Sequence, residues 1–167
     1  EFIRNKSGAG VNLLFNGSFE NNSVGVSATA AGATVPLEEW SIRNNAQGTF
    51  EDSTTPTSQI HSGNVTLHVN AQGNSGLLAY FNQHVMPDGF AVADNEIYSI
   101  SAYIYVVSGS VRIDIGTVGN FSSATSSIAS NNRWQRITAT IVKSPAINID
   151  QFGIYADNGP AEFYIDD

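Results

Sequence analysis

Three segments of the sequence alternate aliphatic residues with aromatic or charged ones, and the latter are the side chains best suited to bind a ligand. They are Tyr103 and Tyr105 in the first segment, Arg112 and Asp114 in the second, and Tyr155 in the third. Flat aromatic rings stack on apolar C–H surfaces, and guanidinium and carboxylate groups hydrogen-bond to hydroxyls. If the three segments share a sheet, these side chains form one aromatic and hydrogen-bonding face.

Paired carboxylates could instead carry out hydrolysis. Two carboxyl groups on either side of a glycosidic bond can cleave it, and Asp114 and Asp157 could provide them. No Ser-His-Asp order supports other chemistry, and His61, His68 and His84 lack metal-ligand spacing. The chain also has no cysteine, which excludes a thiolate metal site. A binding face and a small hydrolase or lyase therefore both stay open at this point.

Strands are the elements that must position these residues. Apolar residues recur with a period of two, whereas the three- and four-residue spacing of helices is nearly absent. Gly, Asn, Pro, Asp and Ser bound the alternating runs, as at Ser108-Gly109-Ser110. The runs are 65–70, 98–105, 111–115, 136–141, 152–157 and 163–165. Many short strands between turns predict an all-β fold, an antiparallel β-sandwich of the jelly-roll type.

Composition limits the partners. The chain of 167 residues suits one domain. Charged residues make up only 13% of it, and the formal net charge is −8. Binding to nucleic acid or to an anionic membrane surface requires clustered Lys and Arg, which are missing, and no apolar run is long enough to span a bilayer. We therefore expect neither nucleic acid nor membrane as a partner.

Both ends of the sequence carry motifs of a known type. Asn12 to Glu20 resembles the opening pattern N-L-[LI]-x-N-G-x-F-E of carbohydrate-binding modules in families four, nine, sixteen and twenty-two, and Phe163 to Asp167 resembles their closing F-Y-[IL]-D-D. Further matches to these modules lie at 61–69, 98–103 and 134–138. The resemblance extends over 11–167, which we expect to be the module. Residues 1–10 are expected to be a vector scar or linker, because Glu1-Phe2 is typical of one.

The resemblance implies a galactose-binding-like jelly roll with a structural calcium ion. Calcium prefers several carboxylate and carbonyl oxygens, and Glu20 and Asp166 lie near the first and last strands. Two carboxylates held close together would repel each other unless a cation lay between them. Carbonyls from the turns that contain Ser18 and Gly63 could complete the shell. The spacing alone equally allows Glu20 and Asp166 to be solvated carboxylates at strand ends.

The resemblance also implies where a sugar binds. In these modules the concave sheet face commonly provides the cleft, and the strand that carries Tyr80 and Gln83 borders it. Trp40 and Trp134 are further candidates for stacking on sugar, although both match scaffold positions of these modules.

The resulting expectation is a non-catalytic, secreted bacterial module that is monomeric and belongs to a larger glycoside hydrolase. Its partner would be a neutral polysaccharide or oligosaccharide of the β-glucan, mannan or xylan type. An adhesion or assembly domain of a surface or phage-tail protein is the alternative among non-enzymes, because the same fold serves there.

Overall fold

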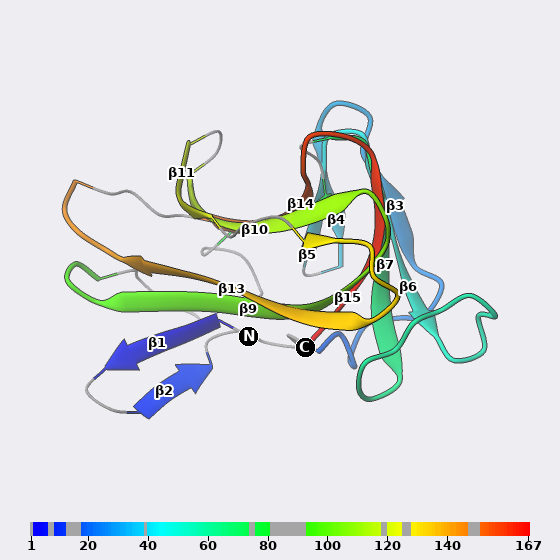
Figure 1. The fold of residues 1–167 in the computed structure, drawn as a ribbon, viewed down its shortest axis with the longest axis horizontal. Coiled ribbons are helices and arrows are strands. Elements are labelled where there is room, and N and C mark those ends of the chain that lie inside the picture. Colours follow the sequence, from blue (N-terminus) through cyan, green and yellow to red (C-terminus); the bar gives the residue numbers. More distant parts are fainter. Residues whose placement is uncertain are drawn as a thin grey trace.

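The computed structural model describes residues 2–6, 9–12, 18–38, 40–73, 76–80, 93–117, 120–124, 128–146 and 151–167. The regular structure of these residues consists of strands, which confirms the all-β prediction. Figure 1 shows them as layers, with β10 and β14 in one layer and β9 and β13 in the other. No helix of the described part is long and apolar enough to cross a membrane.

Two antiparallel sheets form the sandwich. The first has eight strands in the order β2-β1-β9-β15-β7-β6-β3, with β13 paired to β9. Its strands are β1 (Phe2–Lys6), β2 (Ala9–Asn12), β3 (Ser27–Thr29), β6 (Ala46–Asp52), β7 (Val65–Ala71), β9 (Ile97–Ser108), β13 (Trp134–Val142) and β15 (Ala161–Asp166).

The second sheet has seven strands in the order β11-β10-β14-β8-β5-β4, with β12 paired to β10. Its strands are β4 (Thr34–Leu37), β5 (Trp40–Arg43), β8 (Gly76–Tyr80), β10 (Ser110–Thr117), β11 (Asn120–Ala124), β12 (Ile128–Ala129) and β14 (Gln151–Ala156).

The segment expected to be a linker contains strands. Residues 2–6 form β1, which pairs with residues 97–100 of β9, and β2 pairs back onto β1. Residues 2–6 and 9–12 therefore belong to the eight-stranded sheet.

The core lies between the two sheets. Inward residues of β9 and β10 such as Ile104 and Ile113 are fully buried, as the alternation predicts. Aromatic rings fill the space at one end: Phe19 lies 5.1 Å from Trp40 between ring centroids, and Trp40 lies 6.2 Å from Phe152. Alternate residues on β9, β10 and β14 therefore point away from this core on the two outer faces.

Two of the places where the chain passes from one sheet to the other are corners that pack on each other. Gly109 alone connects β9 to β10, and residues 157–160 connect β14 to β15. A side chain at Gly109 would collide with the backbone oxygen of Pro160, and the φ of Gly109 is 76°. The Asp157 N–H donates to the Ser110 carbonyl at 2.8 Å, and the Ser110 hydroxyl donates to the Asp157 carbonyl at 3.0 Å. Only glycine fits this corner without strain.

The corner gives a test of the fold. We expect Gly109→Ala to lower the free energy of unfolding by about 3 kcal/mol, because strain in φ adds to a collision with the backbone. Gly25 has a φ of 84° but no atom within 4 Å of an added Cβ, so the control Gly25→Ala should cost only about 1 kcal/mol. Urea unfolding measures both, and equal losses would contradict the packing of the corners.

Candidate functional site

The expected binding residues lie on two different sheets. Tyr103 and Tyr105 lie on β9 of the eight-stranded sheet, whereas Arg112 and Asp114 lie on β10 and Tyr155 on β14 of the seven-stranded sheet. The prediction of one shared face is therefore wrong. Its physical cause is the corner at Gly109, because that turn does not fold β10 back against β9 as a hairpin but moves the chain to the opposite sheet.

The outward residues of the seven-stranded sheet form a polar face. We use this name for Arg43 on β5, Arg112 and Asp114 on β10, and Gln151 and Tyr155 on β14. Residues opposite each other in register share a face, and the register pairs Arg112 with Tyr155 and Gly116 with Gln151. Asp157, directly after β14, adds a second carboxylate. The polar face therefore combines two guanidinium groups, two carboxylates, an amide and one aromatic ring.

Arg112 links the two carboxylates of this region. Its Nε donates to the Asp114 carboxylate at 2.9 Å, and its Nη1 donates to the Asp157 carboxylate. Burial raises the pKa of Asp114 above its ordinary value, and the hydrogen bond and charge of Arg112 offset part of this rise. Arg112 thus favours the ionised form of a buried carboxylate and fixes its orientation.

The ring of Tyr155 lies flat across the sheet. A side chain at Gly153 would collide with that ring, so glycine makes room for it. The Arg43 guanidinium carbon lies 5.9 Å from the centre of the Tyr155 ring, within the range of a cation–π interaction. The ring is therefore held between the sheet and Arg43.

Polar atoms of this face are buried without partners. Asp114 is 1% exposed and Gln151 is 0% exposed, although both point away from the core. Asp114 Oδ1 and both amide atoms of Gln151 have no hydrogen-bond partner among the described residues. Buried polar groups in proteins are normally satisfied by protein, water or ligand. The polar face is thus an enclosed surface with hydrogen-bonding capacity to spare.

The prediction that Trp40 could stack on sugar is wrong. It is 3% exposed and packs between Phe19 and Phe152 in the core. Trp134 is half-buried on the outer face of the eight-stranded sheet, opposite Tyr105 in register. It is therefore separated from Arg112, Asp114 and Tyr155.

The remaining candidates lie at the border of the described residues. Tyr80 is the register partner of Gln151, at the end of β8 that adjoins the polar face. Gln83 lies outside the described residues.

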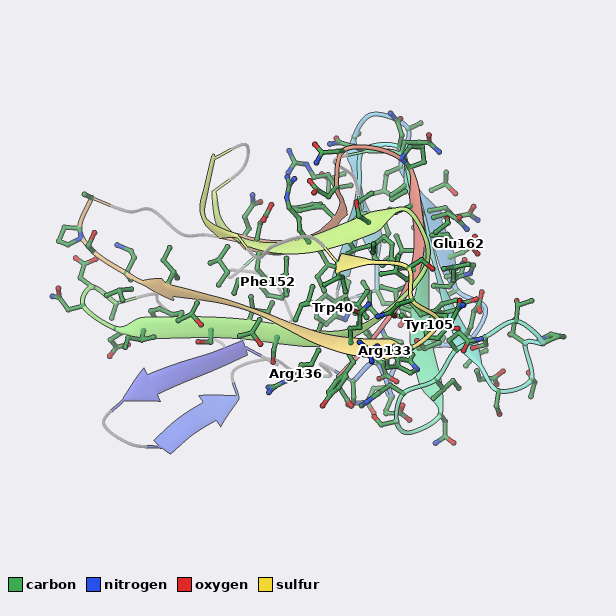
Figure 2. The ribbon with its side chains drawn as sticks, viewed as in Figure 1. Trp40, Tyr105, Arg133, Arg136, Phe152 and Glu162 are labelled. Carbon is green, nitrogen blue, oxygen red and sulfur yellow. The ribbon has the colours of Figure 1, made fainter. Side chains whose placement is uncertain are left out.

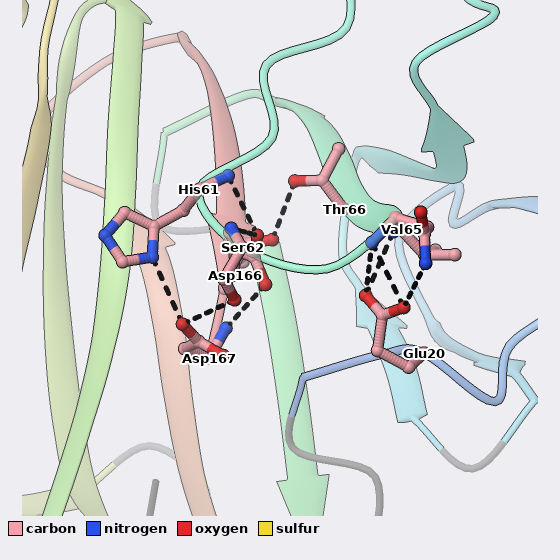
Figure 3. A network of polar contacts seen from close by, with 9 residues as sticks. Glu20, His61, Ser62, Val65, Thr66, Asp166 and Asp167 are labelled. Atoms are coloured by element: carbon pink, nitrogen blue, oxygen red, sulfur yellow. Dashed lines mark hydrogen bonds and ion pairs between the residues drawn. The ribbon is translucent and has the colours of Figure 1, made fainter.

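Glu20 and Asp166 both contact the segment 61–65, as Figure 3 shows. The Asp166 carboxylate accepts the N–H groups of His61 and Ser62, each at 3.0 Å. The Glu20 carboxylate accepts those of Asn64 at 2.9 Å and Val65 at 3.0 Å. The first and last strands do not pair with each other, since β15 lies between β7 and β9.

Gly63 lies between these two sets of hydrogen bonds, with a φ of 63°. A side chain there would collide with the Glu20 carboxylate. Ser18 lies two residues before Glu20 and is half-buried. Asp167 accepts a hydrogen bond from the Ser62 hydroxyl at 2.8 Å, which adds a third carboxylate to the region. Among the described residues, no group of three or more His, Cys, Asp or Glu side chains is arranged to hold a metal ion.

Burial raises the pKa of the Asp166 carboxyl, and the charge of Asp167 adds to the rise, while N–H donors from Ser62 and His61 oppose it. Oxygen-rich, anionic surroundings of this kind suit a hard cation such as calcium.

A two-layer antiparallel sandwich with an enclosed polar face and one flat aromatic ring defines a β-sandwich ligand-binding domain. The chain belongs to the carbohydrate-binding domain family CBM_4_9, whose family model matches residues 11–160. This match confirms the resemblance carried by the opening and closing motifs. No curated protein matches the sequence significantly.

Solved structures share the fold at low sequence identity. The CBM22-1 xylan-binding domain of Paenibacillus barcinonensis Xyn10C has a TM-score of 0.57 at 14% identity, over 84% of this chain and 94% of that one. A cyclase from Fischerella sp. TAU has a TM-score of 0.64 at 12% identity, over 99% and 94%. The enzymatically active domain of bacteriophage CBA120 tailspike protein 4 has a TM-score of 0.52 at 8% identity, over 93% and 20%. Proteins this distant share architecture but not necessarily activity.

Sequence reasoning missed two members of the polar face. Gln151 precedes Phe152 and Arg43 follows Ile42, so each occupies the outward place in an alternating run. This pattern could have identified them as outward-facing. The proximity of Arg43 to Tyr155 depends on β8 lying between β5 and β14, which no local pattern indicates.

The ion pairs of Arg112 give a test with a defined pH dependence. We expect Arg112→Met to lower the free energy of unfolding by about 3 kcal/mol near neutral pH, because it leaves the buried Asp114 carboxylate unpaired. Loss of Arg112 raises the pKa of Asp114 further. A carboxyl with a higher pKa in the folded than in the unfolded state destabilises the fold as pH rises through that pKa.

The deficit of Arg112→Met relative to the parent should therefore shrink as pH falls through the further raised pKa of Asp114 in the variant, because the carboxyl of the parent becomes protonated only at lower pH. Urea unfolding at several pH values measures it. The matched control is Arg133→Met, at an exposed arginine, which should be nearly neutral. A deficit independent of pH would contradict the role of Arg112.

Proposed function

We propose that the domain is a non-catalytic module that binds a neutral, β-linked polysaccharide through the polar face. The observation that carries the proposal is the enclosed Gln151, whose amide has no partner among the described residues, beside the flat ring of Tyr155. A sugar supplies hydroxyls that hydrogen-bond to the amide of Gln151, whereas the Tyr155 ring is 1% exposed and is covered by Arg43.

Charge favours a neutral ligand. The chain carries a formal net charge of −8, and Asp114 and Asp157 contribute two carboxylates to the region of the polar face. An anionic glycan would be repelled by this field. The similar CBM22-1 domain is described as xylan-binding, which puts xylan beside β-glucan and mannan among the first polysaccharides to test.

The arrangement of the carboxylates favours binding over hydrolysis. A glycosidase needs one carboxyl group to donate a proton and another to act as base or nucleophile. Here one guanidinium contacts both Asp114 and Asp157, and Asp114 is fully buried, so both carboxylates are engaged with the same cation rather than placed on either side of an open cleft. We propose that the domain has no hydrolytic activity of its own and is a secreted accessory module of a larger enzyme. Release of reducing ends from polysaccharide by the isolated domain would contradict this.

Gln151→Leu tests the polar face. The substitution removes a buried, unpaired amide at similar volume, so the domain should be as stable as the parent or more stable. Polysaccharide affinity should fall about tenfold, since a hydrogen-bonding group has been lost. A glycan array selects the ligand, and calorimetry with thermal melting measures both effects. The control is Gln47→Leu at an exposed site on β6. Unchanged affinity in Gln151→Leu would overturn the polar face as the binding site.

We further propose that calcium binds at Glu20 and Asp166, with carbonyls of residues such as Ser18 and Gly63 completing the shell. The support is the set of three carboxylates around segment 61–65, with Asp166 fully buried. A bound cation would offset both the burial of charge and the mutual repulsion.

Calcium should raise the stability of the domain by about 3 kcal/mol at a free concentration one hundred times Kd. Thermal melting with added calcium or chelator measures this effect. Glu20→Gln should abolish most of it, whereas Asp94→Asn, at an exposed carboxylate that precedes β9 and contacts Lys143, should leave it intact. A Glu20→Gln variant that responds like the parent would contradict the site.

A further inference from the structure

The outer face of the eight-stranded sheet carries an aromatic cluster that the polar face does not use. Tyr103 and Tyr105 come from β9 and Trp134 from β13, and the loop residue His61 joins them. The rings of His61 and Tyr103 are stacked, with centroids 3.7 Å apart and an angle of 18°. Trp134 lies 5.4 Å from His61 and 5.8 Å from Tyr105, with its ring tilted steeply against both. We call these four residues the aromatic platform.

Register explains why these rings meet. Trp134 lies opposite Tyr105, and Tyr105 lies opposite Tyr164 on β15. The row continues to His68 on β7, whose ring stacks on Tyr164 at 4.4 Å. One line of aromatic residues therefore crosses four neighbouring strands.

The two ends of this row differ in accessibility. Tyr164 is 2% exposed, and its hydroxyl donates to the Thr57 carbonyl at 3.0 Å. His68 is held between Glu51 at 2.8 Å and Glu162 at 3.1 Å. By contrast, Tyr103, Tyr105 and Trp134 keep part of their surface in solvent, and His61 is exposed. The inner end is thus a structural contact, while the platform at the outer end can still take a ligand.

Hydrogen-bonding groups surround the platform. Arg133 precedes Trp134, Arg136 lies opposite Tyr103 in register, and both arginines are exposed; Figure 2 labels both of them together with Tyr105. Arg136 donates to the Ser101 hydroxyl at 2.9 Å, and further along the same two strands the Ser99 and Thr140 hydroxyls are 2.8 Å apart. A flat surface of hydroxyl and guanidinium groups therefore continues from the rings along β9 and β13.

We infer that the aromatic platform is a second sugar-contact surface, on which Trp134, Tyr105 and His61 stack against rings of the same neutral polysaccharide. The inference rests on the proposed function and extends it to the opposite side of the sandwich. Neutral sugar fits better than an anionic one, because Asp166 lies opposite Tyr103 in register and Asp167 contacts His61. Rings already packed together lose little freedom when a ligand binds.

Two surfaces on opposite sheets cannot both hold one short oligosaccharide. They would bind two chains, or one long chain that passes around the domain. Attachment at both surfaces raises the apparent affinity for an insoluble polysaccharide above that of either surface alone.

The two tryptophans allow a direct test. Trp40 is 3% exposed in the core, whereas Trp134 is half-buried on the platform, so acrylamide should quench mainly Trp134. We expect saturating xylohexaose or cellohexaose, whichever binds by calorimetry, to reduce that quenching. The Trp134→Phe variant should lose this response. The Gln151→Leu variant should keep this response, because its substitution lies on the other sheet.

Substitutions in the aromatic platform distinguish binding at the platform from binding at the polar face alone. Tyr105→Leu should weaken binding to insoluble polysaccharide about two- to tenfold, with Thr29→Ala, at an exposed site on the edge strand β3, as a control of unchanged affinity. Quenching unaffected by a ligand that calorimetry detects, together with full affinity in Tyr105→Leu, would overturn the platform and leave the polar face standing. A folded parent domain that binds no polysaccharide at all would overturn the proposed function and, with it, this inference.

Discussion

The contact between the two sheet-crossing corners determines which residues can act together. Gly109 packs against the backbone of Pro160, and Ser110 exchanges two hydrogen bonds with Asp157. Both corners therefore lie at the same edge of the sandwich, where the chain leaves one sheet and later returns to it. Arg112 reaches this edge through its contact with the Asp157 carboxylate. The position of Arg112 in the polar face thus depends on the backbone packing of the two corners, which lie outside the polar face.

Buried charge near this edge is stabilised locally. Asp114 lies within a sheet where the low-dielectric surroundings oppose its ionisation, and Arg112 supplies the compensating charge. The second buried carboxylate, Asp166, is stabilised differently, by N–H groups of the segment before β7. The two sites therefore differ in kind. At Asp114 the carboxylate forms an ion pair with a side chain. At Asp166 the carboxylate accepts hydrogen bonds from backbone N–H groups, which do not neutralise its charge.

The alternation of side chains was enough to predict the strands and most of the core. The inward residues of β9, β10 and β14 are buried as the period of two requires, and the outward residues are those expected. The grouping of outward residues was not predictable, because Ser108-Gly109-Ser110 has the composition of a hairpin turn and also that of a corner between sheets. What distinguishes the two is the contact of Gly109 with Pro160, some fifty residues later in the chain. Trp40 was misassigned for a similar reason, since its inward direction depends on Phe19 and Phe152.

The paired corners also bear on mechanical load. Where force acts on β10 and β14 of the seven-stranded sheet, part of it passes along the chain into the eight-stranded sheet through these two corners. Neither corner can straighten alone, because the hydrogen bonds between Ser110 and Asp157 and the ion pair of Arg112 join them. The two corners therefore share that part of the tension, and straightening either one requires these shared contacts to break.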